Sequence, residues 1–136
     1  MIILKIGGSI LTNKDSTESE VDNDSLKRIA SEIKASLDIS PKQLIIVHGA
    51  GSFGHPPAKK YRIGEAFDES EYPQKRIGFC KTQNAVKKLN MLICEAFIEE
   101  GLPVVAIPAS SFMTANDKRI VEGNLDNFKD WRKYFN

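Results

Sequence analysis

The stretch Leu44-Ile-Ile-Val-His-Gly-Ala-Gly-Ser-Phe-Gly-His-Pro56 decides the fold of this chain. Its first four residues are apolar and predict a buried strand, which runs directly into a loop with three glycines. Glycine lets backbone N–H groups approach an anion without a side chain in the way, and a following helix N-terminus adds partial positive charge. A strand that delivers such a loop predicts a phosphate site, with His48 and His55 at its edges.

A second glycine loop lies near the start of the chain. The short apolar run Met1 to Ile6 predicts a strand that ends at Gly7-Gly8-Ser9. After a polar loop from Thr12 to Asn23, a helix capped by Asp22 or Asp24 is expected, and Ser40-Pro41 ends it. The apolar positions of this helix follow helical spacing: Leu26, Ile29, Ala30, Ile33 and Leu37.

The order strand, helix, strand is typical of a parallel βαβ unit. In such a unit the carboxyl ends of both strands lie at the same edge of the sheet. We therefore expect the two glycine loops to face each other across a crevice. That arrangement suits transfer of a phosphoryl group, where catalysis is mostly positioning and neutralisation of charge. Lys5 and Lys14 are the cations available, although Lys5 alone also fits a strand residue whose side chain extends into solvent.

The rest of the chain predicts further elements of a mixed α/β fold. A short helix around Ala58 to Tyr61 precedes a loop, and a long helix beginning near Pro73 ends at Gly101. Its expected inward positions are Ile77, Ala85, Leu89, Leu92, Ile93, Ala96 and Phe97. A third buried strand is predicted at Val104 to Pro108, followed by a hairpin over Phe112 to Gly123 with its turn at Asn116-Asp117. A terminal helix is predicted over Leu125 to Phe135, with an apolar side formed by Leu125, Phe128, Trp131 and Phe135.

Composition excludes several classes of protein. The 136 residues are 41% hydrophobic and 27% charged, with a formal net charge of +1, so neither nucleic acid nor an anionic membrane is an expected partner. No apolar run approaches the ~18 residues of a membrane helix, and no targeting segment is visible, so we expect a cytoplasmic protein. Cys80 and Cys94 are too few for a disulfide framework or a zinc site, and we expect both to be buried free thiols.

Two nucleotide motifs deserve comparison with these loops. Residues 49–54 formally match G-x-G-x-x-G, but the dinucleotide fingerprint should open a helix directly and be followed about 20 residues later by a strand ending in an acid. Here the loop runs into His55-Pro56-Pro57, and Glu65 to Glu71 forms no expected strand. The pattern G-x-x-x-x-G-K-[ST] is absent from the sequence, so we set aside the P-loop class.

Three motifs together resemble the amino-acid kinase superfamily. They are Lys5-x-Gly7-Gly8-Ser9 with Lys14 beyond it, the segment His48 to Pro56, and Pro108-x-Ser110-Ser111-Phe112. Within the superfamily the sequence is similar to the isopentenyl phosphate kinases. The second histidine of the loop narrows the match, because members that phosphorylate carboxylates usually lack it.

The resemblance implies a role for each matched residue. Lys5, the Gly7 to Ser9 backbone and Gly51 would contact ATP, used with Mg²⁺, and no protein residue is assigned as a metal ligand. Lys14 would stabilise transition-state charge, and His55 would hold the substrate phosphate. Ala50, where many members have glycine, would contact the substrate through its backbone. Catalytic roles thus fall on Lys5, Lys14 and His55.

The resemblance also implies an architecture. It predicts a three-layer αβα sandwich with a mainly parallel sheet, of which residues 1–136 form the N-terminal lobe for the phosphate acceptor. The nucleotide lobe of such kinases has no match in these residues, so we expect a homodimer or a partner that supplies it. Two functions stay open: phosphorylation of isopentenyl phosphate, or of another small phosphate or phosphonate, and a non-catalytic lobe that binds phosphate ligands or self-associates.

Other singled-out residues favour structural roles. His48 is expected to hydrogen-bond the loop backbone, and Lys59-Lys60-Tyr61 is expected to be a solvated helix face. Phe79, Leu89 and Phe97 favour the core over a prenyl pocket. One hydroxyl of Ser110-Ser111 is expected to lie within reach of the site.

Overall fold

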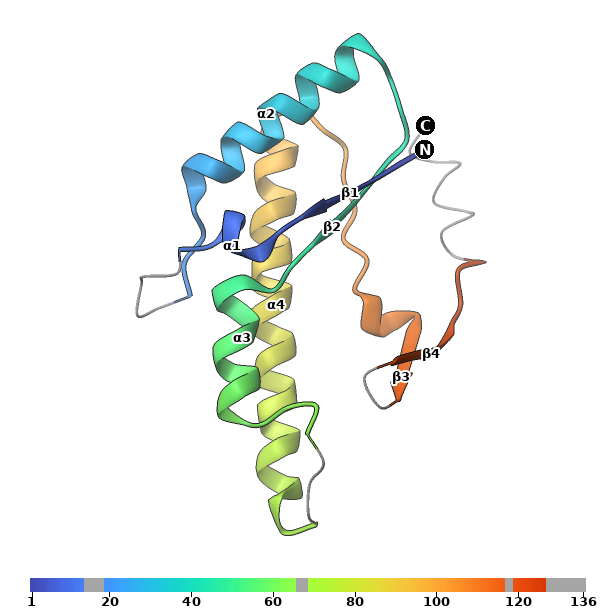
Figure 1. Ribbon diagram of the computed structural model, residues 1–136. Coiled ribbons are helices and arrows are strands. Elements are labelled where there is room, and N and C mark those ends of the chain that lie inside the picture. Colours follow the sequence, from blue (N-terminus) through green and yellow to red (C-terminus); the bar gives the residue numbers. More distant parts are fainter. Residues whose placement is uncertain (14–18, 66–68, 117–118, 127–136) are drawn as a thin grey trace.

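The computed structural model describes residues 1–13, 19–65, 69–116 and 119–126 (Figure 1). The elements, in chain order, are β1 (Ile2–Ile6), α1 (Gly8–Leu11), α2 (Asn23–Ile39), β2 (Leu44–His48), α3 (Gly51–Lys60), η1 (Glu69–Glu71), α4 (Tyr72–Glu99), η2 (Ala109–Ser111), β3 (Met113–Asn116) and β4 (Arg119–Gly123).

The first two strands form the predicted parallel unit. β1 pairs with β2 from Ile2 opposite Leu44 to Ile6 opposite His48, and α2 connects them. Because side chains alternate along a strand, Ile6 is buried on one face while Ile3, 66% exposed, lies on the other. The βαβ prediction is confirmed, and the carboxyl ends of both strands lie at one edge.

The helix α2 begins and ends where its sequence predicts. The Asp22 carboxylate accepts hydrogen bonds from the backbone N–H and the hydroxyl of Ser25, each 2.9 Å long. These bonds favour the charged carboxylate, and the Ser25 backbone N–H is the largest cause that holds the pKa of Asp22 below its ordinary value. At the other end the helix stops at Ile39, two residues before Pro41.

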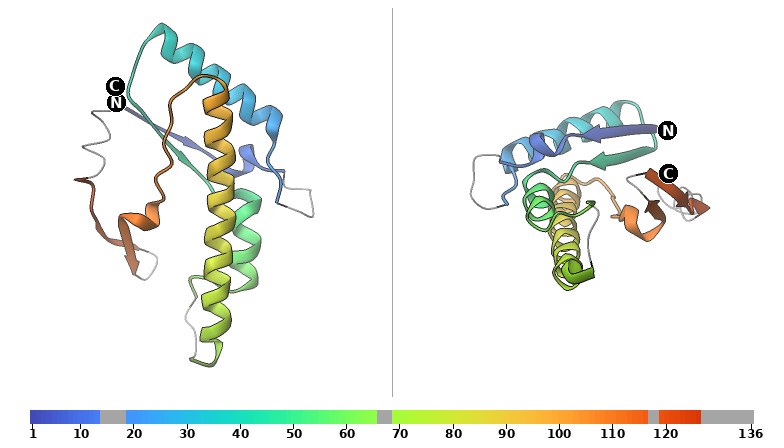
Figure 2. Two further views of the ribbon diagram at one scale, coloured as in Figure 1. Left: turned by 180° about the vertical axis from the view of Figure 1, so that it is seen from behind. Right: turned by 60° about the horizontal axis from the view of Figure 1, so that its bottom comes forward.

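The core lies where α2 crosses one end of the long helix α4, against β1 (Figures 1 and 2). Its buried apolar residues are Ile6, Leu11, Val21, Leu26, Ala30, Phe53, Leu89, Ile93, Phe97 and Leu102. Six of the seven predicted inward positions of α4 belong to this core or pack against it: Ala85, Leu89, Leu92, Ile93, Ala96 and Phe97. The helix ends at Glu99, and Gly101, two residues later, has a φ of +78°, the left-handed conformation that glycine adopts readily.

The first half of α4 is more exposed than its sequence predicts. Ile77 is 56% exposed, Phe79 is 51% exposed and Cys80 is exposed, so the predictions of an inward isoleucine, a core phenylalanine and a buried thiol are wrong. The reason is that, within the described residues, α3 packs along one side of this half of the helix, where Tyr61 lies against Gly78, and the side that carries Ile77 and Phe79 stays exposed. Cys94, in the second half, is partly buried, and desolvation raises the pKa of its thiol.

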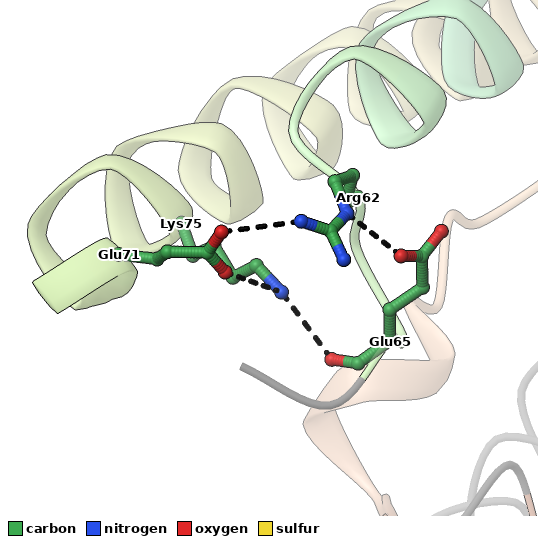
Figure 3. Close-up of polar contacts among 4 residues, drawn as sticks. All are labelled: Arg62, Glu65, Glu71 and Lys75. Carbon is green, nitrogen blue, oxygen red and sulfur yellow. Dashed lines mark hydrogen bonds and ion pairs between the residues drawn. The ribbon is translucent and has the colours of Figure 1, made fainter. Parts of the chain in front are cut away.

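Ion pairs join the segment after α3 to the start of α4 (Figure 3). Arg62 Nε donates to Glu65 at 2.8 Å, and its Nη1 donates to Glu71 at 3.1 Å. Lys75 Nζ lies 3.6 Å from the second Glu71 oxygen and donates to the Glu65 carbonyl at 3.4 Å. Glu71 therefore joins both cations and ties the segment after α3 to the first turn of α4.

The sheet is smaller than the predicted sandwich. The prediction of a third buried strand is wrong, because residues 104–108 form no strand and no ladder pairs them with β1 or β2. Val104 nevertheless packs against the core. The described fold is mixed α/β with one parallel and one antiparallel pair of strands, and the face of β1–β2 that carries Ile3 and Val47 is not covered.

The predicted hairpin is confirmed as β3 and β4, which pair antiparallel and lie apart from β1–β2 (Figures 1 and 2). The second turn residue, Asp117, lies outside the described residues. So does most of the expected terminal helix, including Phe128, Trp131 and Phe135. Across the part of the chain that the structure describes, no helix has the length and apolarity to cross a membrane.

We predict that Leu89→Ala lowers the free energy of unfolding by about 2–5 kcal/mol, because it leaves a cavity at a site with 0% exposure. Met91→Ala, on the same helix at a position 60% exposed, should change it by less than about 0.5 kcal/mol. Urea denaturation of both variants measures the difference. Similar midpoints for the two would contradict the assignment of the core.

Candidate phosphate-binding site

The two glycine segments touch at the carboxyl ends of β1 and β2. A hydrogen bond of 3.0 Å from the Gly49 N–H to the Ile6 carbonyl continues the ladder beyond the strands. A Cβ atom added to Gly8 would lie 2.3 Å from the Gly51 nitrogen, and one added to Gly49 would lie 2.7 Å from the Gly8 nitrogen. The segments are therefore in direct backbone contact, closer than the crevice that the sequence predicts.

Both glycine segments lead straight into helices instead of extended loops. Gly8 is the first residue of α1, and Gly51, with φ +50°, is the first residue of α3. The expected helix around Ala58 to Tyr61 therefore begins seven residues earlier than predicted. The first N–H groups of a helix have no partner within it, so α3 directs its positive end toward this contact.

Two prolines lie inside α3, where proline normally breaks a helix. Pro56 has no N–H to donate to the carbonyl of Ser52, four residues earlier. The hydroxyl of Ser19 donates to that carbonyl instead, at 2.9 Å.

One argument against the dinucleotide fingerprint, that prolines prevent a helix from opening at the glycines, is thus wrong. The other stands, because residues 65 and 69–71 form no strand.

His48 has a structural role at the end of β2. Its Nδ1 lies 3.1 Å from the carbonyl of Gly49, and its Nε2 lies 2.9 Å from the amide nitrogen of Asn90 on α4. These contacts fit a ring that donates from Nδ1 and accepts at Nε2. The prediction that His48 bonds the loop backbone is confirmed, and both ring nitrogens already have partners.

Four of the remaining predicted site residues lie on the elements that lead into or out of the glycine contact. Lys5 is exposed near the end of β1, opposite Val47, and Ser9 is exposed on α1. Ala50 directly precedes α3, and His55 is exposed on the helix four residues after Gly51, about one turn away. Lys14 lies outside the described residues.

Sequence reasoning missed Thr12. Its side chain is 3% exposed and its hydroxyl is bonded to both glycine segments, to Gly8 O at 2.9 Å and to Ser52 N at 3.0 Å. Thr12 lies at the start of a polar stretch without periodicity. Its position directly after the apolar pair Ile10-Leu11 is the one sequence signal that could have identified it as a buried residue. The Ser52 hydroxyl is also buried, and it has no hydrogen-bond partner within the described residues.

Ser110 and Ser111 do not join this group. They lie in η2, beside the hairpin and away from α1 and α3 in both views (Figures 1 and 2). Together with Phe112, Thr114 and Glu122 they line a separate cavity of about 240 Å³. The expectation that one of these hydroxyls reaches the site is wrong for this structure, because the connection after α4 leads away from the sheet edge.

The comparisons with known proteins agree with the motifs. The model of the amino acid kinase family matches residues 1–133. An isopentenyl phosphate kinase of Methanothermobacter thermautotrophicus is 52% identical over 126 residues, which are 92% of this chain and 46% of that protein. One of Methanocaldococcus jannaschii is 40% identical over 128 residues, 90% of this chain and 48% of that protein.

A solved structure gives the same result for the fold. An X-ray structure of an isopentenyl phosphate kinase superposes with a TM-score of 0.91 at 46% identity, covering 98% of this chain and 54% of that chain. The resemblance read from the motifs is confirmed. The chain spans about half the length of the curated relatives it matches.

We predict that Gly8→Ala lowers the free energy of unfolding by about 1–3 kcal/mol, because the new Cβ forces the two backbones apart. Gly7→Ala is the matched control. Gly7 has φ −63°, and its added Cβ would meet atoms at ordinary distances of 3.8–3.9 Å. This variant should keep or slightly raise stability. Thermal denaturation of both measures the effect, and equal midpoints would show that the glycine contact is loose.

Proposed function

Because this chain belongs to the amino acid kinase family, we propose that it supplies the phosphate-acceptor side of a kinase that transfers the γ-phosphoryl group of ATP to isopentenyl phosphate. Residues 1–136 would form the N-terminal lobe of that enzyme. The products would be ADP and isopentenyl diphosphate. The similarity to isopentenyl phosphate kinases over 90% or more of this chain supports the choice of acceptor.

The observation that carries the proposal is the backbone contact between Gly8 and Gly51. Phosphoryl transfer requires two phosphate groups to be held in line at close range, with their charge neutralised. Two glycine segments at the same sheet edge place two sets of backbone N–H groups side by side. No Cβ atom stands between them, so two phosphates bound there would be neighbours.

The proposed roles divide between the two segments. Lys5, the Gly7–Ser9 backbone and Gly51 contact the phosphates of ATP. The backbone of Ala50 and the imidazole of His55 hold the acceptor phosphate, with His55 as a donor from the exposed side of α3. Lys14 neutralises charge on the phosphoryl group as it moves. These assignments rest on the motifs and, for the described residues, on the elements next to the glycine contact that carry them.

The described residues fit the phosphates better than they fit a metal ion. A Cβ atom at Gly8 or Gly51 would meet backbone atoms of the other segment, so glycine at both positions is what allows the two segments to bring their backbone N–H groups together, as a phosphate site requires. No group of three or more His, Cys, Asp or Glu residues gathers in the described ranges. Mg²⁺ would therefore be held mainly through the phosphate oxygens of ATP, where it would neutralise their charge.

We predict that His55→Ala raises the KM for isopentenyl phosphate and lowers kcat, with a loss of about 1.5–3 kcal/mol in transition-state stabilisation, because a charge-assisted contact to phosphate is removed. Lys60→Ala, which removes an exposed cation from the same helix, is the control and should change kcat/KM less than about threefold. Steady-state assays of ADP release on the full natural polypeptide measure both.

Lys14→Ala should act mainly on kcat, because its charge matters most as the phosphoryl group moves. The same assay separates the two residues. If His55→Ala and Lys14→Ala both have small and equal effects on turnover, the chemistry has been assigned to the wrong residues. If the unchanged protein gives no ATP-dependent phosphorylation of isopentenyl phosphate, the proposed function is wrong.

A further inference from the structure

The hydroxyl of Thr12 connects the two glycine segments across 40 positions of sequence. It donates to the carbonyl of Gly8 at 2.9 Å and accepts the backbone N–H of Ser52 at 3.0 Å. Thr12 is 3% exposed and is the one polar residue in the buried class among the residues described. A buried hydroxyl with both its donor and an acceptor position in use is a defined connection between two backbones.

This connection lies beyond the reach of the sheet. The β1–β2 ladder ends at Ile6 opposite His48, followed by one further bond from Gly49 to Ile6. After that point, within the described residues, the hydrogen bond from the Ser52 N–H to the Thr12 hydroxyl joins the segment of α1 to the first turn of α3, and the bond from the same hydroxyl to Gly8 O holds the hydroxyl in place.

Thr12 is itself held firmly. Its backbone forms an antiparallel bridge with Val21, and the Asp22 N–H donates to the carbonyl of the neighbouring Leu11 at 2.9 Å. Leu11 has 0% exposure and belongs to the core. The Thr12 hydroxyl therefore links both glycine segments to the packed core of the protein.

The fit around this hydroxyl is close. A Cβ atom added to Gly51 would lie 2.4 Å from Thr12 Oγ1 and 2.7 Å from the Gly8 carbonyl oxygen. Gly8, Thr12 and Gly51 thus form one packed unit. A change in the length of either hydrogen bond would move one glycine segment relative to the other.

We propose that Thr12 is a positioning residue that sets the separation between the ATP phosphates and the acceptor phosphate; this inference rests on the proposed function. Thr12 needs no contact with either substrate for this role. Without the connection, the Gly7–Ser9 backbone would still contact ATP, and Ala50 and His55 would still contact the acceptor, but the two phosphates would lose their fixed separation. Misplacement of reacting groups by about 1 Å costs about 100-fold in rate, so the effect falls on the transfer step.

The test compares two variants of the full natural polypeptide. Thr12→Val keeps the shape of the side chain and removes the hydroxyl, whereas Thr12→Ser keeps the hydroxyl. Thr12→Val should lower kcat by about 10- to 100-fold and change the KM for ATP and for isopentenyl phosphate less than about threefold. Thr12→Ser should restore kcat to within about threefold of the unchanged protein.

A purely structural role would lower the melting temperature of Thr12→Val and leave kcat per folded molecule unchanged, and this outcome overturns the proposal. Equal loss of kcat in the serine and valine variants also overturns it, because the hydroxyl would not be the cause.

Hydrogen exchange at the Ser52 amide tests the connection without any turnover. Exchange should be slow in the unchanged protein and in Thr12→Ser, and faster in Thr12→Val. The same slow exchange in all three would overturn the connection. Absence of phosphorylation by the unchanged protein, with the Ser52 amide still protected, identifies a failure of the proposed function and removes the positioning role with it. Turnover that Thr12→Val leaves intact identifies a failure of this inference alone.

Discussion

The site depends on the absence of two Cβ atoms. Gly8 and Gly51 come from segments more than 40 positions apart, and any side chain at either position would overlap backbone atoms of the other segment. This close approach fixes where α1 and α3 begin and brings the ends of β1 and β2 into one structure. Because backbone cannot withdraw in the way a flexible side chain can, the constraint reaches the strands and through them the core.

Local patterns in the sequence predicted much of this structure because they depend on neighbouring residues. The spacing of Leu26, Ile29 and Ala30 determined α2, and Asp22 determined its start. The strand Leu44–His48 followed from a continuous apolar run. The site was predictable because glycine leaves the backbone accessible. The glycines that follow both strands therefore pointed to the segments around Gly8 and Gly51 as one site.

What the sequence could not predict depends on distant partners. The prolines of α3 indicated a loop, whereas in the structure the hydroxyl of Ser19, from another part of the chain, donates to the carbonyl that Pro56 leaves without a helical N–H. The apolar run after Pro103 indicated a strand, but a strand needs a neighbour with free backbone groups. Ile77 and Phe79 follow helical spacing correctly, yet periodicity does not say which half of a long helix is covered. Thr12 is recognisable only from its contacts.

The hydroxyl of Ser19, which supplies the hydrogen bond that Pro56 cannot make, also links α3 to a distant part of the chain. A helix nucleates by forming its first turns from nearby residues, and α3 lacks the N–H groups of two consecutive positions there. The carbonyl of Ser52 receives its donor instead from the hydroxyl of Ser19, 33 positions earlier in the chain. The stability of α3 is therefore coupled to the placement of the residue that precedes α2 in the chain and supplies this donor.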